Sequence, residues 1–539
     1  MLRNAYWAKT DEVDVLELST GDALRRAATH LPDRVALIET APDEMESIVA
    51  ADTTDRRWTY AELLDDAQAC AQWLLSKFEP GEHICLWAPN VPEWVIIQYG
   101  AAMAGLVLVT ANPALRENEL RHVLKESRSV ALIHVAAFRG SDMNGVAKRV
   151  ADEIRERIVL HRFADILGPY PGSAALPDVS PESPAQIQFT SGTSGKPKGT
   201  LLRHKSLVTN SAMVAHRIGQ DRDVVVTPMT LFHTAGSVLG VIGASTTLST
   251  LVLPLLFEPT LMLRAIEREK ATVIAGVPTM LAALLEKLGA QDHDLSSVRV
   301  AYSGGASVPA ALCRRVEQAI GAPLVSVYGQ TELSPIVCAT SPRDSEQDKA
   351  ETSGRPLPQV DVRIAAIGTD DPVAIDEEGE IQARGYQTMI GYVGEAQNGD
   401  DTLSEDGWLR TGDLGRMDER GYVKVTGRLS DMIIRGGENI YPAEVENVLV
   451  SHADVAQAAV FGIPDDHWGE IVAAAVVLDQ DAPLPTAEAL RDHCRNAMAP
   501  QKTPTQWFIA EILPMTASGK IQKFALNRQA ESGELRPLK

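Results

Sequence analysis

The sequence predicts an α/β protein in which a large N-terminal domain is followed by a small α+β C-terminal domain. Helical and extended patterns alternate through the first half of the chain, which is typical of βαβ subdomains with mostly parallel sheets. After about residue 355 the pattern changes to short strands separated by Asp and Gly turns, which predicts antiparallel sheet. The last stretch of about 110 residues, beyond Arg428, is long enough to fold by itself.

The first half supports the parallel-sheet prediction element by element. Thr59 and Glu62 form a capping box, so a helix begins there. Leu63, Ala67 and Leu74 recur on one face of that helix. The elements predicted further along are a strand at 83–87, a helix from about Pro92, and strands at 106–110, 297–302 and 324–327 with a helix at 308–320. We therefore expect several βαβ subdomains in the N-terminal domain.

The second half predicts two further pieces of structure. Short strands are expected at 362–367, 379–384, 408–411 and 422–426. We expect them to form a small β-barrel or, alternatively, a flanking sheet. The C-terminal unit is predicted to have helices at 442–451 and 487–497 and strands at 455–461, 471–478 and 507–510. The domain boundaries are accordingly placed at 1–428 and 429–539.

Composition narrows the class of protein. The chain has 539 residues, which is too many for one hydrophobic core, and its 45% apolar and 23% charged residues are ordinary for a soluble globular protein. Its 50 basic and 72 acidic residues give a net charge of −22, which argues against nucleic acid or anionic membranes as general partners. The oligomeric state stays open between monomer and homodimer.

Cysteine usage and the apolar stretches predict a cytoplasmic location. The five cysteines are far apart and form no CxxC pair, so we expect reduced thiols. Charged residues interrupt any N-terminal apolar run, which argues against a signal peptide. The stretches 94–115 and 234–257 are uncharged and long enough to span a membrane, but they contain proline and polar residues. We interpret both as buried helix-plus-strand segments and expect no integral membrane segment.

A loop rich in glycine, hydroxyl and lysine side chains follows a predicted strand at 185–189. Its glycines allow backbone N–H groups to approach an anion, and its lysines add positive charge. The loop contains Thr190, Ser191, Gly192, Thr193, Ser194, Gly195, Lys196, Pro197, Lys198 and Gly199. The common P-loop spacing is absent, because two residues rather than four separate Gly192 from Gly195. This composition predicts a phosphate site; a flexible surface turn is the alternative.

Three more motifs carry groups that suit a nucleotide. Tyr328-Gly329-Gln330-Thr331-Glu332 ends a predicted parallel strand, where ligands bind in open α/β sheets, and offers a ring, a hydroxyl and a carboxylate suited to Mg²⁺. Asp413, after Gly412, can accept hydrogen bonds from ribose hydroxyls. Near the C-terminus, Gly519 and Lys520 belong to a second loop that carries a lysine. Taken alone, the tyrosine motif could be a capped turn and Asp413 a plain turn aspartate.

Together these motifs resemble the adenylate-forming superfamily of acyl- and aryl-CoA ligases, peptide-synthetase adenylation domains and beetle luciferases. These four motifs and the loop with paired glycines at Gly436 and Gly437 occur in the family's order, and the resemblance covers roughly residues 20–525. It implies a large N-terminal domain that binds ATP and an acid, and a small, mobile C-terminal domain that swings between two poses. The hinge would lie near Ser430, where the family usually has Asp or Lys.

The resemblance also implies roles for individual residues. The loop from Thr190 to Gly199 would hold the β- and γ-phosphates of ATP. Adenine would lie between the backbone of Gly304, Gly305 and Ala306 and the ring of Tyr328, and Gly329 is a further cofactor-binding candidate. The other implied roles are the α-phosphate for Thr331, Mg²⁺ for Glu332, ribose for Asp413 with Arg428 nearby, and the coenzyme A thiol tunnel for Gly436 and Gly437. Lys520 would bridge the acid's carboxylate and the α-phosphate, and Ser326 replaces the family's frequent Asn before the tyrosine motif.

The implied reaction joins a small-molecule carboxylic acid to ATP as acyl-AMP and then to the thiol of coenzyme A. Amino-acid-activating relatives tend to have aspartate at the position of His233, so His233 resembles the acyl- and aryl-CoA ligases and favours a fatty or aromatic acid. A buried core histidine is the alternative. Pocket-lining candidates are His233, Ser237, Gly304, Gly305, Gly329 and Ile336.

The acceptor of the acyl group stays open. Besides coenzyme A, the alternatives are a carrier-protein thiol, an amine, or nitrite activation with transfer to an aryl amine. A nucleotide-binding protein without catalysis is disfavoured by the retained Lys520, Thr331, Glu332 and Asp413.

Overall fold

The computed structural model describes residues 1–42, 49, 55–154, 158–166, 175–190, 197–289, 293–306, 308–397, 401–465, 467–479, 482–515 and 521–538. The chain forms two compact units. The large unit consists of Trp7–Val362 and Ala383–Leu409, and the small unit of Met1–Tyr6, Arg363–Gln382 and Arg410–Lys539. The sequence analysis places a domain boundary after residue 428, where a mobile C-terminal domain would begin. That boundary stays a prediction.

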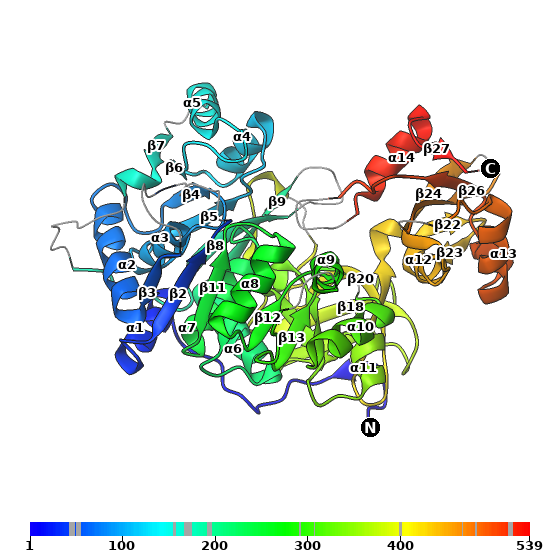
Figure 1. The fold of residues 1–539 in the computed structure, drawn as a ribbon, viewed down its shortest axis with the longest axis horizontal. Coiled ribbons are helices and arrows are strands. Elements are labelled where there is room, and N and C mark those ends of the chain that lie inside the picture. The colour runs from blue at the N-terminus through cyan, green and yellow to red at the C-terminus, as the bar shows by residue number, and fades with distance from the viewer. Residues whose placement is uncertain are drawn as a thin grey trace. The chain divides into compact units, whose positions relative to one another are not determined.

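The large unit contains two mostly parallel sheets, which confirms the predicted α/β class (Figure 1). The nine-stranded sheet has the order β16 (Arg355–Pro356), β15 (Ile336–Ala339), β14 (Leu324–Gly329), β13 (Val300–Ser303), β12 (Val273–Ala275), β10 (Val224–Val226), β11 (Thr250–Pro254), β2 (Val35–Thr40) and β3 (Arg57–Thr59). The seven-stranded sheet has the order β19 (Gly391–Val393), β9 (Lys198–Arg203), β8 (Pro184–Thr190), β5 (Val107–Ala111), β4 (His83–Trp87), β6 (Ala131–His134) and β7 (Val159–Arg162).

Parallel pairing fills the centre of each sheet, and antiparallel pairing occurs toward the edges. The strands β11, β10, β12, β13 and β14 pair in parallel, whereas β15 is antiparallel to β14. In the other sheet β4 is parallel to β5 and β6, and β9 is antiparallel to both β8 and β19. Parallel strands place their carboxyl ends along a common edge, where open α/β sheets bind ligands.

Helices cover the sheets of the large unit. They are α1 (Thr20–His30), α2 (Tyr60–Leu75), α3 (Pro92–Met103), α4 (Glu117–Glu126), α5 (Met143–Glu153), α6 (His204–Ile218), α7 (Gly243–Thr246), α8 (Pro259–Glu269), α9 (Pro278–Leu288), α10 (Ala310–Ile320) and α11 (Glu346–Glu351). Helix α8 packs on β10 and β11, and α8, α9 and α10 lie along one side of the nine-stranded sheet in Figure 1. Short helices are η1 (Phe163–Asp165), η3 (Thr331–Leu333), η4 (Gly394–Gln397) and the π-helix η2 (Ala235–Ile242).

The two uncharged stretches are buried segments of the fold, as predicted. All 12 residues of α3 are buried, because this helix contacts strands of both sheets, β5 and β2. Residues 234–257 form η2, α7 and β11. Within the described residues, no helix combines the length and apolar character that a membrane crossing requires.

A five-stranded sheet replaces the expected small β-barrel. Its order is β1 (Tyr6–Trp7), β17 (Val360–Ala365), β18 (Gly379–Gly385), β20 (Leu409–Met417) and β21 (Val423–Arg428). Among the described strands, β1 and β21 stand at opposite ends of this order and do not pair with each other, so the sheet is open. A barrel closes only when its edge strands hydrogen-bond, and strand and turn patterns do not determine that pairing. The alternative expectation, a flanking sheet, fits this arrangement.

The small unit also contains a sheet with its own hydrophobic core. The order is β23 (Glu438–Ile440), β22 (Ile433–Arg435), β25 (Gly469–Leu478), β26 (Gln506–Ile509) and β27 (Arg536–Pro537), with β24 (Val455–Asp465) pairing β25. Its helices are α12 (Pro442–Val450), α13 (Ala487–Ala497) and α14 (Lys523–Ser532), with the short helices η5 (Leu429–Asp431) and η6 (Pro500–Lys502). Val460, Leu490 and Trp507 are buried together in one of its clusters.

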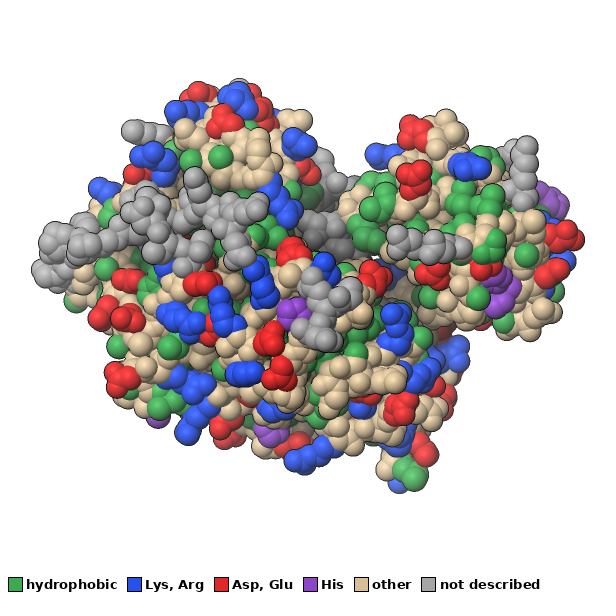
Figure 2. All heavy atoms as spheres, in the orientation of Figure 1, with side chains coloured by type: hydrophobic (Ala, Val, Ile, Leu, Met, Phe, Trp, Pro, Cys, Tyr) green, Lys and Arg blue, Asp and Glu red, His purple; other side chains and the backbone are tan. Residues whose placement is uncertain are grey.

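The net charge of −22 is not gathered into one acidic area on the face drawn in Figure 2. Acidic and basic side chains are interspersed there across the described part of the chain. Mixed signs keep the local field weak, because neighbouring opposite charges offset each other and salt screens exposed charges beyond about 8 Å at physiological ionic strength.

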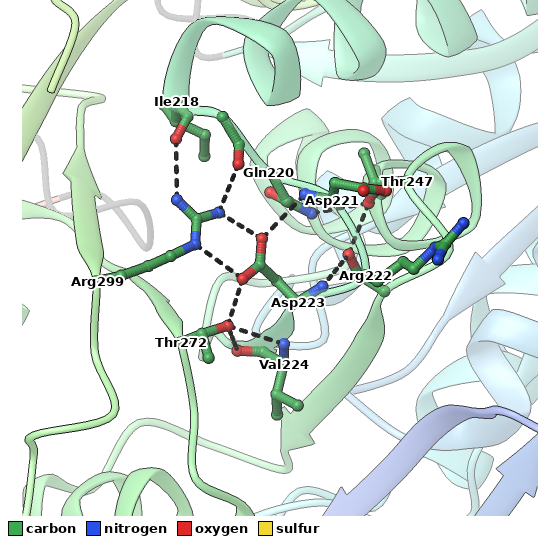
Figure 3. Close-up of polar contacts among 12 residues, drawn as sticks. Ile218, Gln220, Asp221, Arg222, Asp223, Val224, Thr247, Thr272 and Arg299 are labelled. Atoms are coloured by element: carbon green, nitrogen blue, oxygen red, sulfur yellow. Dashed lines mark hydrogen bonds and ion pairs between the residues drawn. The ribbon is translucent and has the colours of Figure 1, made fainter. Parts of the chain in front are cut away.

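An ion pair joins three strands of the nine-stranded sheet at the start of β10 (Figure 3). The guanidinium of Arg299 donates from Nε to Oδ1 of Asp223 at 2.9 Å and from Nη2 to Oδ2, and Thr272 Oγ1 donates to Asp223 Oδ1 at 2.6 Å. Burial alone would raise the pKa of Asp223, but the hydrogen bonds from Arg299 and Thr272 hold it below its usual range. The three residues precede β13, β10 and β12, so the pair fixes the register of this part of the sheet.

Arg299→Met is expected to lower the free energy of unfolding by about 2 kcal/mol, because it leaves the buried Asp223 carboxylate short of donors. Urea unfolding at neutral pH measures this loss. The difference from the wild type should shrink as the pH falls below about 4, because a carboxyl with a depressed pKa stabilises the fold only while ionised. Lys270→Met is the control: the Lys270–Asp294 pair is exposed, with side-chain exposures of 63% and 50%, so its loss should cost less than about 1 kcal/mol. Equal losses in both variants would contradict this role.

Candidate active site

The predicted phosphate loop connects two paired strands of the large unit. Strands β8 and β9 form an antiparallel hairpin in which Thr190 is opposite Lys198 and Phe189 is opposite Gly199. Ser191, Gly192, Thr193, Ser194, Gly195 and Lys196 lie outside the described residues. Gly199 is required by packing, because a Cβ there would come within 2.6 Å of the Val393 side chain. The hairpin therefore holds both ends of the loop.

Helix α4 supports the same loop from outside the hairpin. Nε2 of His122 is 2.9 Å from the carbonyl oxygen of Pro197, the residue before β9. The His122 ring also meets the ring of Phe189 edge-on, with centroids 6.1 Å apart. No sequence motif marks His122, and its contact with the loop follows from the packing of α4.

The predicted adenine-binding residues lie at the carboxyl ends of two adjacent parallel strands. Strands β13 and β14 pair so that Ser303 is opposite Ser326, and Gly304, which follows, lies against Val327, the residue before Tyr328. A Cβ on Gly304 would lie 2.6 Å from the carbonyl oxygen of Val327, so only glycine allows this approach. Gly305 and Ala306 are exposed and Tyr328 is half-buried. Backbone and ring surfaces therefore remain accessible for a flat ligand.

Strand β14 ends at Gly329, and η3 then carries Thr331 and Glu332. A Cβ on Gly329 would collide with the carbonyl of Pro335, so the chain can turn back this tightly only at glycine. Thr331 is half-buried and Glu332 is 8% exposed. The hydroxyl of Tyr392 donates a hydrogen bond of 2.8 Å to Oε1 of Glu332. Tyr392 belongs to β19 and was not among the residues that sequence reasoning selected.

The surroundings of Glu332 fit a magnesium ion shared with phosphates better than a closed metal cage. Among the described residues, no group of three or more His, Cys, Asp or Glu side chains is placed to hold a metal. Mg²⁺ in phosphate-transfer sites commonly takes one or two carboxylates together with substrate phosphates and water. Glu332 can supply one such carboxylate.

His233 lies on a turn that is held by buried polar side chains. Its carbonyl oxygen accepts hydrogen bonds from the backbone N–H and the hydroxyl of Ser237, each at 3.0 Å. Gln188 of β8 donates from Nε2 to the same hydroxyl at 3.0 Å. Gln188 is two residues before Thr190. The structure therefore ties the His233 turn to the strand that enters the phosphate loop, while the His233 side chain remains half-buried.

The other predicted site residues belong to the small unit. Asp413 on β20 is opposite Arg428 on β21, and Arg428 Nε donates to Asp413 Oδ1 at 2.7 Å. Asp413 is 5% exposed. Gly436 and Gly437 form the exposed turn between β22 and β23 with φ of +61° and +85°, backbone angles that favour glycine.

Lys520 lies outside the described residues. The described site residues that the sequence predicts divide between the two units. The large-unit group is Thr190, Lys198, His233, Gly304, Gly305, Ala306, Tyr328, Gly329, Thr331 and Glu332. The small-unit group is Asp413, Arg428, Gly436 and Gly437.

Comparison with known proteins matches nearly the whole chain. Residues 24–393 match the family model described as AMP-binding enzyme, and residues 444–520 match the AMP-binding enzyme C-terminal domain. The medium-chain acyl-CoA ligase ACSF2 of Mus musculus, described as mitochondrial, is 33% identical over 555 residues, covering 96% of this chain and 88% of that protein.

Two solved structures are similar along the same length. The anthranilate CoA ligase AuaEII in complex with anthranoyl-AMP is 26% identical, with a TM-score of 0.84 over 98% of this chain and 100% of that chain. The amide bond synthetase McbA from Marinactinospora thermotolerans is 27% identical, with a TM-score of 0.81 over 94% of this chain and 99% of that chain.

Proposed function

The chain belongs to the AMP-binding enzyme family, and from this premise we propose that it activates a carboxylic acid with ATP and transfers the acyl group to coenzyme A. The observation that carries the proposal is the arrangement at the ends of β13 and β14. There the glycine backbone at Gly304 packs against Val327, beside Tyr328. Four residues after Tyr328, the chain places the buried carboxylate of Glu332.

In the first half-reaction, a carboxylate oxygen of the acid attacks the α-phosphorus of ATP. The new bond joins that oxygen to phosphorus, and the bond from the α-phosphorus to the bridging oxygen breaks, so pyrophosphate leaves. Both reactants are anions, and the chain must offset their repulsion. We propose that Lys198 and the loop that begins at Thr190 bind the β- and γ-phosphates. Thr331 is assigned to the α-phosphate and Asp413 to the ribose hydroxyls.

Two positive charges complete the proposed site. Mg²⁺, held by Glu332 and the phosphates, would neutralise charge that develops on the leaving oxygens. Lys520 would lie between the acid's carboxylate and the α-phosphate, as the family resemblance implies. The likeness to relatives whose names state an acyl-CoA ligase activity and a bound acyl-AMP supports these roles.

In the second half-reaction, the thiol of coenzyme A loses its proton and the sulfur attacks the acyl carbonyl carbon. The bond between that carbon and the phosphate oxygen breaks, and AMP leaves. Lys520 must withdraw to admit the thiol, so we propose that residues 429–539 move as a domain about Ser430. The position of Ser430 supports this proposal, because the residue is exposed in η5, between β21 and β22. Its hydroxyl donates a hydrogen bond of 3.2 Å to Oδ1 of the neighbouring Asp431.

We propose a fatty or aryl acid as substrate, because His233 occupies the position at which amino-acid-activating relatives tend to have aspartate. The test is pyrophosphate release with a panel of fatty, aryl and amino acids, each with and without coenzyme A. Release that depends on a fatty or aryl acid, with thioester formed when coenzyme A is added, is expected. Preference for an amino acid would contradict the assignment of His233.

An amine acceptor is the second candidate function, and the similarity to an amide bond synthetase is the observation that favours it. The same panel separates the two candidates when it includes a simple aryl amine in place of coenzyme A. Amide in the absence of thioester would favour the second candidate.

We further propose that the enzyme works in a reducing compartment such as the cytoplasm. All five cysteines are buried and free. Burial raises the pKa of Cys338 to about 12, which suppresses the reactive thiolate.

A further inference from the structure

One tyrosine connects two charged residues of the proposed site. Tyr392 is the middle residue of β19, where it is opposite Thr200 of β9, and Val393 is opposite Gly199. Its side chain is buried, with the residue 7% exposed. The strand therefore seats Tyr392 directly beside the strand that leaves the phosphate loop.

The phenol of Tyr392 and the backbone of the same segment both bind Glu332. The hydroxyl donates to Oε1 of Glu332 at 2.8 Å, and the N–H of Met389 donates to the Glu332 carbonyl oxygen at 2.9 Å. Hydrogen bonds to an ionised carboxylate are shorter and stronger than neutral ones, so they fix the carboxylate plane. The bond uses part of the accepting capacity of Oε1 and leaves Oε2 to face another ligand.

The ring of Tyr392 contacts the second charged residue. The ammonium of Lys198 lies 4.6 Å from the centroid of the ring, a cation–π contact. The ring of Tyr392 therefore contacts a cation assigned to the phosphates, and its hydroxyl contacts a carboxylate assigned to the metal.

We propose that Tyr392 is a positioning residue that orients Glu332 toward Mg²⁺ and holds the ammonium of Lys198 against its ring, on the strand that leaves the phosphate loop. This inference rests on the proposed function, because it assigns the carboxylate to a metal and the lysine to phosphate. Its side chain contacts Glu332 and Lys198, and we assign its effect to these two neighbours. Partners of metal-binding side chains commonly contribute 10- to 100-fold to metal affinity or activity.

Tyr392→Phe removes one hydroxyl and keeps the ring, so the strand pairing and the contact with Lys198 remain. The measurement is ATP binding by calorimetry, once with excess Mg²⁺ and once with a chelator. In the wild type, Mg²⁺ should tighten ATP binding. In Tyr392→Phe we expect this tightening to fall by about tenfold or more, with little change in ATP binding without metal.

Tyr386→Phe is the matched control. Tyr386 lies on the same segment and is buried, and its hydroxyl accepts a hydrogen bond from Asn210 Nδ2 at 3.3 Å instead of binding Glu332. This variant should keep the wild-type effect of Mg²⁺. If both tyrosine variants lose the same share of the Mg²⁺ effect, or if Tyr392→Phe loses none, the inference is overturned.

A second variant tests whether Tyr392 acts through Glu332. In a Glu332→Gln background, Tyr392→Phe should add little to the loss of Mg²⁺ dependence, because coupled residues are not additive. Full additivity of the two losses would overturn the inference. A wild type that binds ATP equally with and without Mg²⁺ would overturn it as well. Acid-dependent pyrophosphate release tests the proposed function separately, so the two failures can be distinguished.

Discussion

Lys520→Ala is expected to lower acid-dependent pyrophosphate release by about 100- to 1000-fold, the usual loss when one group that stabilises developing charge is removed. The lysine is proposed to lie between two anions in the first half-reaction and to be absent from the second. Thioester formation from coenzyme A and supplied acyl-AMP should therefore remain largely unchanged. The measurement compares the two half-reactions in the same preparation.

Lys523→Ala is the control for the loss of a nearby lysine. Lys523 pairs with Glu446 at 2.8 Å inside the small unit. Its removal should affect the stability of that unit and leave the ratio of the two half-reactions unchanged. If Lys520→Ala reduces both half-reactions equally, Lys520 does not have the proposed role.

Glu332→Gln is expected to lower kcat/KM for Mg·ATP by about 100-fold, because a metal ion contributes several kcal/mol of charge stabilisation in such a reaction. The substitution keeps the side-chain length and leaves an oxygen that accepts the hydrogen bond of Tyr392. The concentration of Mg²⁺ at half-maximal pyrophosphate release should rise, and titration with Mg²⁺ at fixed ATP measures it.

Glu126→Gln is the control for the loss of a carboxylate in the large unit. Oε2 of Glu126 accepts a hydrogen bond from the backbone N–H of Glu395 at 2.7 Å, so the residue supports η4 without being assigned to the metal. Its Mg²⁺ dependence should match the wild type. An unchanged Mg²⁺ dependence in Glu332→Gln would remove Glu332 from the metal site.

The sequence predicts the parts of this fold that depend on local pattern. Strands such as β4 and β14, and helices such as α10 and α13, occur where apolar periodicity and turn residues indicate them. Residues after β13 and β14 come together because parallel strands share a carboxyl edge. The glycine at 304 was selected by its motif, and the structure adds the reason, which is the close approach of Val327.

Features that depend on pairing between distant segments could not be predicted. Tyr392 meets Glu332 and Lys198 because β19 pairs with β9, strands that are almost two hundred residues apart in the chain. No spacing or composition near Tyr392 signals that contact. The open five-stranded sheet has the same explanation, because closure into a barrel depends on whether β1 and β21 meet. His122 likewise reaches Pro197 only through the packing of α4.

The most direct test is a single-turnover experiment with the enzyme in excess over a fatty or aryl acid. ATP and Mg²⁺ are added first without coenzyme A, the reaction is quenched, and acyl-AMP and pyrophosphate are quantified by mass spectrometry. Equal amounts of acyl-AMP and pyrophosphate are expected, with the acyl-AMP converted to thioester and AMP when coenzyme A is added. Thioester formation with no acyl-AMP at any time, or pyrophosphate release that does not depend on the acid, would contradict the proposed adenylate-forming reaction.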